Sequence, residues 1–423
     1  MTELPRDHKL RRQLNDEVHA RLPQPLQTPA RISYLALLTD EAQQATSGQA
    51  VAALAARFDA PLPDPAANHY SADLGPFRLT WERHTEFVRY TVIVPGAGDE
   101  VALSAVPADW IAALPGQVLV ATHVSLTGMA ADLLASATRM FPRDALVGAT
   151  VADGAGAVFA DFHIRDSGFG RMLVQDGSMT PQQAGRVVQR LLEIDTYRMI
   201  ALLALPVAQG LAPAVARCEQ ELARITAAMV VAGEADEPSL LERLTRLAAE
   251  IDSRQADTLF RFSAAAAYYE LVQRRIGDLR ETRIGPLQTL GEFMERRLAP
   301  AMNTCQSVAA RQEELSRRVA RATQLLSTRV GVTRERQNQM VLATMNRRVR
   351  LQLRLQSTVE GLSVAAVTYY IVGLIGYAAK GGEATGLRLD PAVATAVSIP
   401  VVAGLMAFGI RRIRRHVTEA DQP

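Results

Sequence analysis

Two glutamates and a histidine alternate in the segment WERHTEF, as Glu82, His84 and Glu86. On a β-strand, alternate side chains share one face and lie about 7 Å apart. Carboxylates and an imidazole in this arrangement could bind a metal ion or exchange protons with a substrate. The same residues also fit a hairpin turn at residues 83–85 or an exposed polar edge, and we favour this structural interpretation.

A second group of this kind lies near the start of the chain, in LNDEVHAR. His19 follows Asp16 and Glu17, so these side chains could also hold a metal ion, although they fit a solvent-facing helix surface at least as well. Residues 153–156 (DGAG) lack the spacing and the lysine of a phosphate-binding loop and favour a turn. No GxSxG, HExxH, CxxC or dinucleotide-binding motif occurs, so the sequence predicts no catalytic residues, no metal site and no cofactor.

The part that would position Glu82, His84 and Glu86 is a predicted mixed α/β domain, residues 1–178. Apolar, aromatic and β-branched runs predict its strands, and Asp-Gly and Asp-Ser-Gly segments predict turns between them. A helix is expected at residues 41–58. Strands are expected at residues 32–38, within 77–94, at 118–124, and three times within 145–174.

Residues 179–356 predict a bundle of helices and a stalk. Thr180, Pro181 and Gln183 form a capping box with proline at the first helical position. We expect this helix to end at Pro206. Further helices are expected at residues 212–232, 238–283 and 286–331, with a last one from 333 onward into the apolar C-terminal region.

Residues 357–412 predict a two-helix transmembrane hairpin, followed by a cytoplasmic tail at 413–423. The two uncharged apolar runs, residues 362–379 and 392–410, are each about as long as a helix that crosses the hydrocarbon core of a bilayer. The whole chain is therefore expected to be α+β, with a cytoplasmic domain, a stalk and a membrane hairpin.

Arginines flank both outer ends of this hairpin. Because basic residues are retained on the cytoplasmic side, they predict that both termini are cytoplasmic and the connecting loop is outside. The flanking residues are Arg347, Arg348, Arg350, Arg354, Arg411, Arg412, Arg414 and Arg415. The start of the chain has no apolar stretch of a signal peptide, and the two cysteines suggest no disulfide framework, which fits a reducing compartment.

The segment before the hairpin carries a basic stripe and an apolar seam. Residues 311–356 hold eleven arginines against three glutamates, and such a segment attracts anionic lipid of the inner leaflet. The net charge of the whole chain is only +2, so we expect no nucleic-acid partner. The seam predicts coiled-coil packing, against other helices of the chain or against neighbouring copies in a homo-oligomer. Its residues are Leu342, Met345, Val349, Leu353 and Gln356.

Polar and small residues within the first apolar run could line a pore or allow helices to approach closely. Small residues also recur in the second run, and Pro400 is expected to kink it. The candidate pore or packing residues are Ser363, Thr368, Tyr369, Tyr370, Gly373 and Gly376.

Five segments resemble the signature segments of a bacterial domain-of-unknown-function family, whose members are described as uncharacterised membrane-anchored proteins. The resemblance covers about residues 8–412 and implies an inner-membrane protein, without implying an activity. The segments are RRQLNDEVHAR, WERHTEF, GRVVQRLLEIDTYRMIALLALP, RFSAAAAYYELVQRRI and LQSTVEGLSVAAVTYYIVGLIGY.

The order of the parts also resembles CorA-type divalent-cation channels, which are homopentamers with the first span lining the pore, and the required-for-meiotic-nuclear-division family of membrane-tethered assemblies. CorA-type channels carry a Gly-Met-Asn signature where the first span leaves the membrane. Here residues 376–382 read GYAAKGG, so the asparagine is missing and Lys380 places a cation at the mouth. This departure speaks against magnesium selectivity.

Three hypotheses follow. The first is an oligomeric, membrane-anchored scaffold or interaction protein without catalysis. The second is a CorA-like ion channel or transporter that lacks the signature. The third is an enzyme that uses Glu82, His84 and Glu86 or His19. We favour the first, because the sequence holds an apolar seam and no recognisable active-site motif.

Overall fold

The computed structural model describes residues 6, 8–11, 15, 23–384 and 390–420, and all structural statements below refer to them. The chain is α+β, as the sequence predicts. It divides into two compact units, which we describe separately. The N-terminal unit comprises Met1–Ala232 and Pro238–Gln324, and the C-terminal unit comprises Gly233–Glu237 and Leu325–Pro423.

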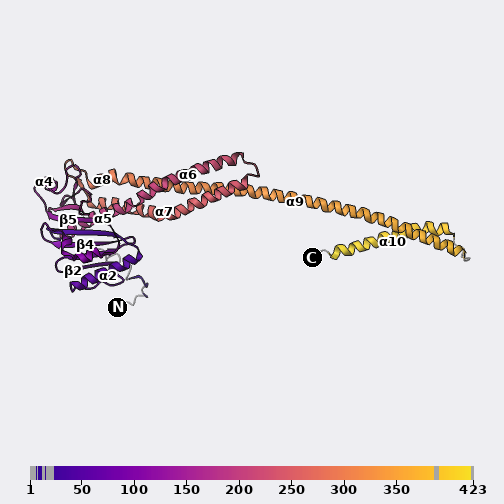
Figure 1. The fold of residues 1–423 in the computed structure, drawn as a ribbon, viewed down its shortest axis with the longest axis horizontal. Helices are drawn as coiled ribbons and strands as arrows, with labels where there is room; N and C mark the ends of the chain where they lie inside the picture. The colour runs from indigo at the N-terminus through magenta and orange to yellow at the C-terminus, as the bar shows by residue number, and fades with distance from the viewer. Residues whose placement is uncertain (1–5, 7, 12–14, 16–22, 385–389, 421–423) are drawn as a thin grey trace. The chain divides into compact units, whose positions relative to one another are not determined.

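A nine-stranded sheet forms one end of the N-terminal unit, and long helices of the same unit extend away from it (Figure 1). Its strand order is β2-β3-β4-β1-β5-β8-β7-β6-β9, and only the β5–β8 pair is parallel among the described strands. The strands are β1 (Ala30–Leu38), β2 (His69–Asp73), β3 (Arg78–Arg83), β4 (Phe87–Pro95), β5 (Gln117–Gly128), β6 (Val147–Val151), β7 (Gly156–Ala160), β8 (Gly170–Asp176) and β9 (Thr282–Arg283).

Helices cover both faces of this sheet. Because side chains alternate along a strand, one face presents an apolar cluster from β1, β3 and β4 to α2 (Glu41–Arg57), with Trp81 and Leu54 at its centre. The short elements η1 (Ala102–Ala105) and α3 (Ala108–Ala112) complete this cluster. A second cluster packs α4 (Leu133–Thr138) against β7 and β8.

The other face is covered by α5 (Pro181–Leu202), which begins with the expected capping box at Thr180 and Gln183. The chain segment before β1 crosses the start of this helix closely. A Cβ atom on Gly185 would overlap the backbone oxygen of Gln24, so glycine is required for this crossing. Nearby, the Leu26 amide donates a hydrogen bond to the carbonyl oxygen of Pro181, with a donor–acceptor distance of 2.9 Å.

The helices after α5 differ from the predicted ones. The first helix ends at Leu202 and not at Pro206, and the second starts at Ala204 and not at Ala212. Pro206 lies in the first turn of α6 (Ala204–Val231), where a proline costs no helical hydrogen bond, but Pro213 lies inside it. Packing of α6 against its neighbours thus outweighs one missing hydrogen bond.

Next come α7 (Glu237–Leu279), α8 (Leu290–Arg297) and α9 (Ala299–Ala384). The predicted break at residues 330–331 is wrong, because α9 passes through Gly331 and Thr333 without interruption. A glycine inside a helix costs only about 1 kcal/mol relative to alanine, which the rest of a long helix easily offsets. Within the N-terminal unit, α6, α7 and the first part of α9 run side by side (Figure 1), joined by ion pairs such as Arg311–Glu219.

In the C-terminal unit, α10 (Pro391–Ala420) folds back along the end of α9 (Figure 1). Among the described residues, three helical stretches are long and apolar enough to cross a membrane: Pro181–Val231, Ala299–Gly381 and Pro391–Gly409. The most apolar window of the first is 39% buried, since α5 and α6 pack within the N-terminal unit, whereas those of the other two are only 6% buried. The first stretch was not among the spans that the sequence predicts.

Candidate functional site: a buried charge network beside α5

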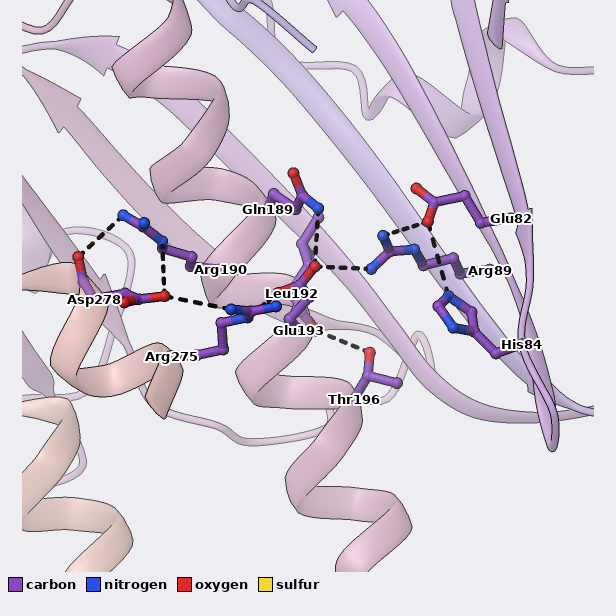
Figure 2. Close-up of polar contacts among 10 residues, drawn as sticks. All are labelled: Glu82, His84, Arg89, Gln189, Arg190, Leu192, Glu193, Thr196, Arg275 and Asp278. Carbon is purple, nitrogen blue, oxygen red and sulfur yellow. Dashed lines mark hydrogen bonds and ion pairs between the residues drawn. The ribbon is translucent and has the colours of Figure 1, made fainter. Parts of the chain in front are cut away.

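Arg89 is a buried arginine on β4, at the centre of the sheet face that α5 covers. Its Nη2 atom lies 2.5 Å from Glu82 Oε2 on β3, and its Nη1 atom lies 3.4 Å from Glu193 Oε1 on α5 (Figure 2). Burial by itself lowers the pKa of Arg89, but the two carboxylates outweigh this effect and raise that pKa above its usual range. The guanidinium therefore stays charged between two anions.

Glu193 connects this arginine to α7. Its Oε1 atom also accepts a hydrogen bond from Gln189 at 2.9 Å, and its Oε2 atom accepts one from Arg275 Nε at 2.5 Å (Figure 2). Arg275 in turn lies 3.3 Å from Asp278, so alternating charges link the sheet, α5 and α7. Buried charges are stable only when they are paired in this way, because an isolated charge loses its hydration without compensation.

Tyrosine and threonine hydroxyls extend the polar face of α5. The Tyr34 hydroxyl lies 2.7 Å from Thr196 Oγ1, and the Thr196 hydroxyl donates to the carbonyl oxygen of Leu192 at 2.8 Å. Thr196 has a single hydroxyl hydrogen, so Tyr34 is the donor of the first bond. Burial raises the pKa of Tyr34 above its usual range, which keeps this hydroxyl neutral and able to donate.

A second buried carboxylate on α5, that of Asp195, forms a hydrogen bond to β5. Asp195 Oδ2 accepts a hydrogen bond from Thr122 at 2.7 Å, and Arg198 binds Asp195 Oδ1 through Nε and Nη2 at 2.9 and 2.6 Å. The guanidinium of Arg198 also lies over the ring of Phe162, 4.9 Å from its centre. This group fixes α5 to the sheet at a second point.

The charge network borders a small cavity of about 50 Å³, lined by Glu82, Arg89, Tyr34 and Gln189 among others. Such a volume holds about one or two water molecules and no organic substrate. The described part of the chain contains no group of three or more His, Cys, Asp or Glu side chains placed to hold a metal ion. The charge network therefore couples the sheet to α5 and α7.

The structure keeps Glu82 and His84 of the WERHTEF segment together and separates Glu86 from them. Glu82 lies near the end of β3, whereas His84 and Glu86 lie in the connection to β4. The three residues therefore do not share a strand face. His84 Nε2 lies 3.8 Å from Glu82 Oε2 (Figure 2). The His84 ring stacks on the ring of Phe87. Glu86 instead pairs with Arg261 of α7. The hairpin interpretation matches this arrangement. His19, Asp16 and Glu17 lie outside the described residues.

The candidate pore or packing residues lie on α9 in the C-terminal unit. Five of the six line an open groove of about 1250 Å³ between α9 and α10: Thr368, Tyr369, Tyr370, Gly373 and Gly376. The sixth, Ser363, donates a hydrogen bond to the Val359 carbonyl oxygen of its own helix. α10 packs closely against Gly376, where a Cβ atom would lie 3.0 Å from Thr395 Oγ1.

The flanking arginines of α9, namely Arg347, Arg348, Arg350 and Arg354, are solvent-exposed. Arg412 on α10 is exposed as well, and the side chains of Arg411, Arg414 and Arg415 are not among those described. The seam residues Leu342, Met345, Val349 and Leu353 are 60, 58, 52 and 55% exposed.

Sequence reasoning missed Arg89, Glu193 and Arg275, although a signal existed. Arg89 interrupts the apolar strand FVRYTVIV, and Glu193 interrupts the apolar face of the helix VVQRLLEIDTYRMI. Charges at positions where the periodicity requires burial indicate a paired network. The partner of each charge comes from a distant segment, which periodicity cannot identify.

Comparison with known protein families identifies a match. The family model described as "Protein of unknown function (DUF3422)" matches residues 6–417, nearly the whole chain. No curated protein and no solved structure matches the chain.

Proposed function

This chain belongs to the DUF3422 family, and we propose that it is a membrane-anchored scaffold that acts by self-association and binding, without catalysis of its own. In this proposal the C-terminal unit provides the anchor. The N-terminal unit, whose sheet and helices are joined by buried ion pairs, provides the interaction surface on the cytoplasmic side of the inner membrane.

The observation that carries the proposal is the exposed apolar surface at the end of the chain. Leu362, Leu374 and Leu405 are 74, 68 and 66% exposed, and both apolar stretches are only 6% buried in their most apolar windows. Transferring one such side chain from water into an apolar phase is worth about 1.5–3 kcal/mol, so a bilayer would stabilise this hairpin strongly.

The charges around the hairpin support an orientation. The exposed arginines Arg347, Arg350 and Arg354 precede the first span, and Arg412 follows the second. The positive-inside rule then puts both termini in the cytoplasm, where these arginines would meet anionic lipid headgroups.

The exposed seam supports self-association. Apolar side chains that recur on one side of a helix are stable in water only when another surface covers them. Since the four apolar seam residues of a single chain are each more than half exposed, we propose that neighbouring copies cover them.

A CorA-like channel is the alternative, and the groove that Thr368 and Tyr369 line between α9 and α10 is the observation in its favour. Flux of Mg²⁺ or Co²⁺ into liposomes that contain the protein tests this alternative. We expect no flux above that of empty liposomes, because Lys380 lines the same groove and repels cations.

Topology mapping tests the anchor. Alkaline phosphatase, which is active only outside the cytoplasm, is inserted at residues 385–389 or fused after residue 423, and green fluorescent protein is fused in parallel. We expect phosphatase activity only from the loop insertion and fluorescence only from the C-terminal fusion. Recovery of the protein in the soluble fraction after carbonate washing, or the opposite reporter pattern, would contradict the proposal.

A further inference from the structure

A groove of about 530 Å³ lies between α7 and α9 in the N-terminal unit, where the function proposed above assigns nothing. This volume falls within the range of about 300–1,000 Å³ that is typical of small-molecule sites. Small side chains of both helices leave the space open: Ser263, Ala265 and Ala266 on α7, and Cys305, Ala309 and Ala310 on α9.

The groove has a polar end and an apolar remainder. Thr258 contacts Gln312, whereas Asp252 contacts Ser316, so the two helices run antiparallel. The polar end is lined by Gln255, Thr258, Gln312 and Glu313, and the remainder by Phe262, Tyr269 and Met302, among others. Ten residues of helix separate Met302 from Gln312, so the groove extends over about 15 Å.

At the polar end, Gln312 is only 4% exposed, and one of the two polar atoms of its side-chain amide lacks a hydrogen-bond partner among the described residues. The Thr258 hydroxyl lies 2.8 Å from the Arg254 carbonyl oxygen and 3.3 Å from Gln312 Oε1. Because this hydroxyl has only one hydrogen, it donates to only one of the two oxygens at a time. Gln312 Nε2 has no hydrogen-bond partner within the described chain. Turning the amide over would pair its nitrogen with Thr258 and leave its oxygen unpaired instead.

We propose that this groove binds an amphiphile with one apolar chain and a neutral, hydroxyl-bearing head, such as a long-chain alcohol or a monoacylglycerol. A hydroxyl both donates and accepts, so it satisfies Gln312 in either orientation of the amide. The apolar chain fills the space along Phe262 and Met302. An anionic head is excluded, because Glu313 lines the polar end and no arginine or lysine lines the groove. The site does not depend on membrane insertion of the C-terminal unit.

Photo-crosslinking of the full chain, purified in lipid nanodiscs, tests the site. The probe is a monoacylglycerol with a diazirine near the end of its acyl chain, and labelled peptides are identified by mass spectrometry. We expect labelling within residues 255–269 and 302–313. A fatty-acid probe with the same diazirine and a carboxylate head should label these peptides at least fivefold less.

Two neighbouring alanines give a matched pair of variants. Ala266→Leu fills the groove and should reduce labelling at least tenfold. Ala267→Leu places the same side chain at an exposed position that does not line the groove, and should leave labelling unchanged. Gln312→Leu keeps the volume but removes the polar anchor, and one lost hydrogen bond corresponds to a decrease of about fivefold.

Equal labelling of the two alanine variants would overturn the proposal, as would label confined to residues 362–410. Equal labelling by the fatty-acid probe would overturn the head-group assignment. Crosslinks from these helices to a second copy, without lipid label, would show that a protein fills the groove instead. If Ala266→Leu does not fold, as judged by circular dichroism, the labelling of Gln312→Leu is compared with that of the unaltered chain. Equal labelling of these two proteins would then overturn the proposal.

Discussion

Glu82 and Arg89 are direct cross-strand partners on β3 and β4, and their side chains meet at 2.5 Å while only 9 and 6% exposed. The pair lies on the face that α5 covers, so both side chains are largely shielded from bulk water. Glu193 adds a second carboxylate from the helix. One arginine thus holds two buried anions from two layers of the unit.

The variant Arg89→Met should destabilise the N-terminal unit by about 3–5 kcal/mol, because it leaves the buried Glu82 without its guanidinium partner and removes one of the two arginines that Glu193 contacts. Hydrogen–deuterium exchange of β3, β4 and α5 in the full chain measures the effect. The control Arg57→Met breaks the exposed pair with Asp109 and should leave exchange unchanged. Equal exchange in the two variants would show that the buried network contributes little.

The stability of the N-terminal unit should fall as the pH falls from about 6.5 toward 4. Burial, with a contribution from Arg171, lowers the pKa of His123 to about 4. The unfolded chain therefore binds a proton at a higher pH than the folded chain, and acid favours unfolding within this window. Above pH 6.5 both states are neutral at this residue, so it causes no pH dependence there.

The variant His123→Asn should remove this part of the pH dependence while keeping an acceptor for the Ser33 hydroxyl, which lies 2.8 Å from His123 Nδ1. Thermal unfolding of the full chain at a series of pH values measures it. His163→Gln, at an exposed position, is the control and should retain the slope. An unchanged slope in His123→Asn would assign the pH dependence to another group.

The variant Gly185→Ala should destabilise the protein by about 1–3 kcal/mol. The new Cβ atom would overlap the backbone oxygen of Gln24, and a backbone atom cannot rotate away as a flexible side chain can. Gly210→Ala on α6 is the matched control, because nothing lies within 4 Å of its Cβ position. This control should stabilise the helix by about 0.5–1 kcal/mol, since alanine favours helices over glycine. Denaturant unfolding compares the two variants.

The variant Leu353→Asn should lower the oligomeric state of the protein if copies meet along the seam. Leu351→Asn is the control, since a leucine two residues away points about 200° around the helix. The two leucines are 55 and 53% exposed, so the substitutions remove similar apolar areas. Native mass spectrometry from nanodiscs measures subunit number. A monomeric unaltered chain would refute self-association, and equal losses in both variants would refute the seam as its site.

Much of the fold follows from local patterns. The expected strand at residues 32–38 is β1 (Ala30–Leu38), and the expected helix at 41–58 is α2 (Glu41–Arg57). The three strands expected within 145–174 are β6, β7 and β8. In these segments, apolar periodicity and turn residues agree, and local preference coincides with the final structure.

The predictions of secondary structure fail where contacts between segments that are distant in the sequence determine the structure. Proline and glycine predict helix ends, but Pro213 and Gly331 lie inside α6 and α9, because the flanking turns supply more stabilisation than one residue removes. The strands β2 (His69–Asp73) and β9 (Thr282–Arg283) were not predicted. Both are short and polar, and only their pairing partners on other segments define them.

The pairing of β9 with β6 bears on how the polypeptide folds during its synthesis. The chain leaves the sheet after β8 (Gly170–Asp176) and returns to its edge only at Thr282–Arg283, after three helices. A nascent chain still short of this point exposes the open edge of β6 at the ribosome. Exposed strand edges pair with other strands, so this intermediate is prone to aggregation until β9 covers the edge.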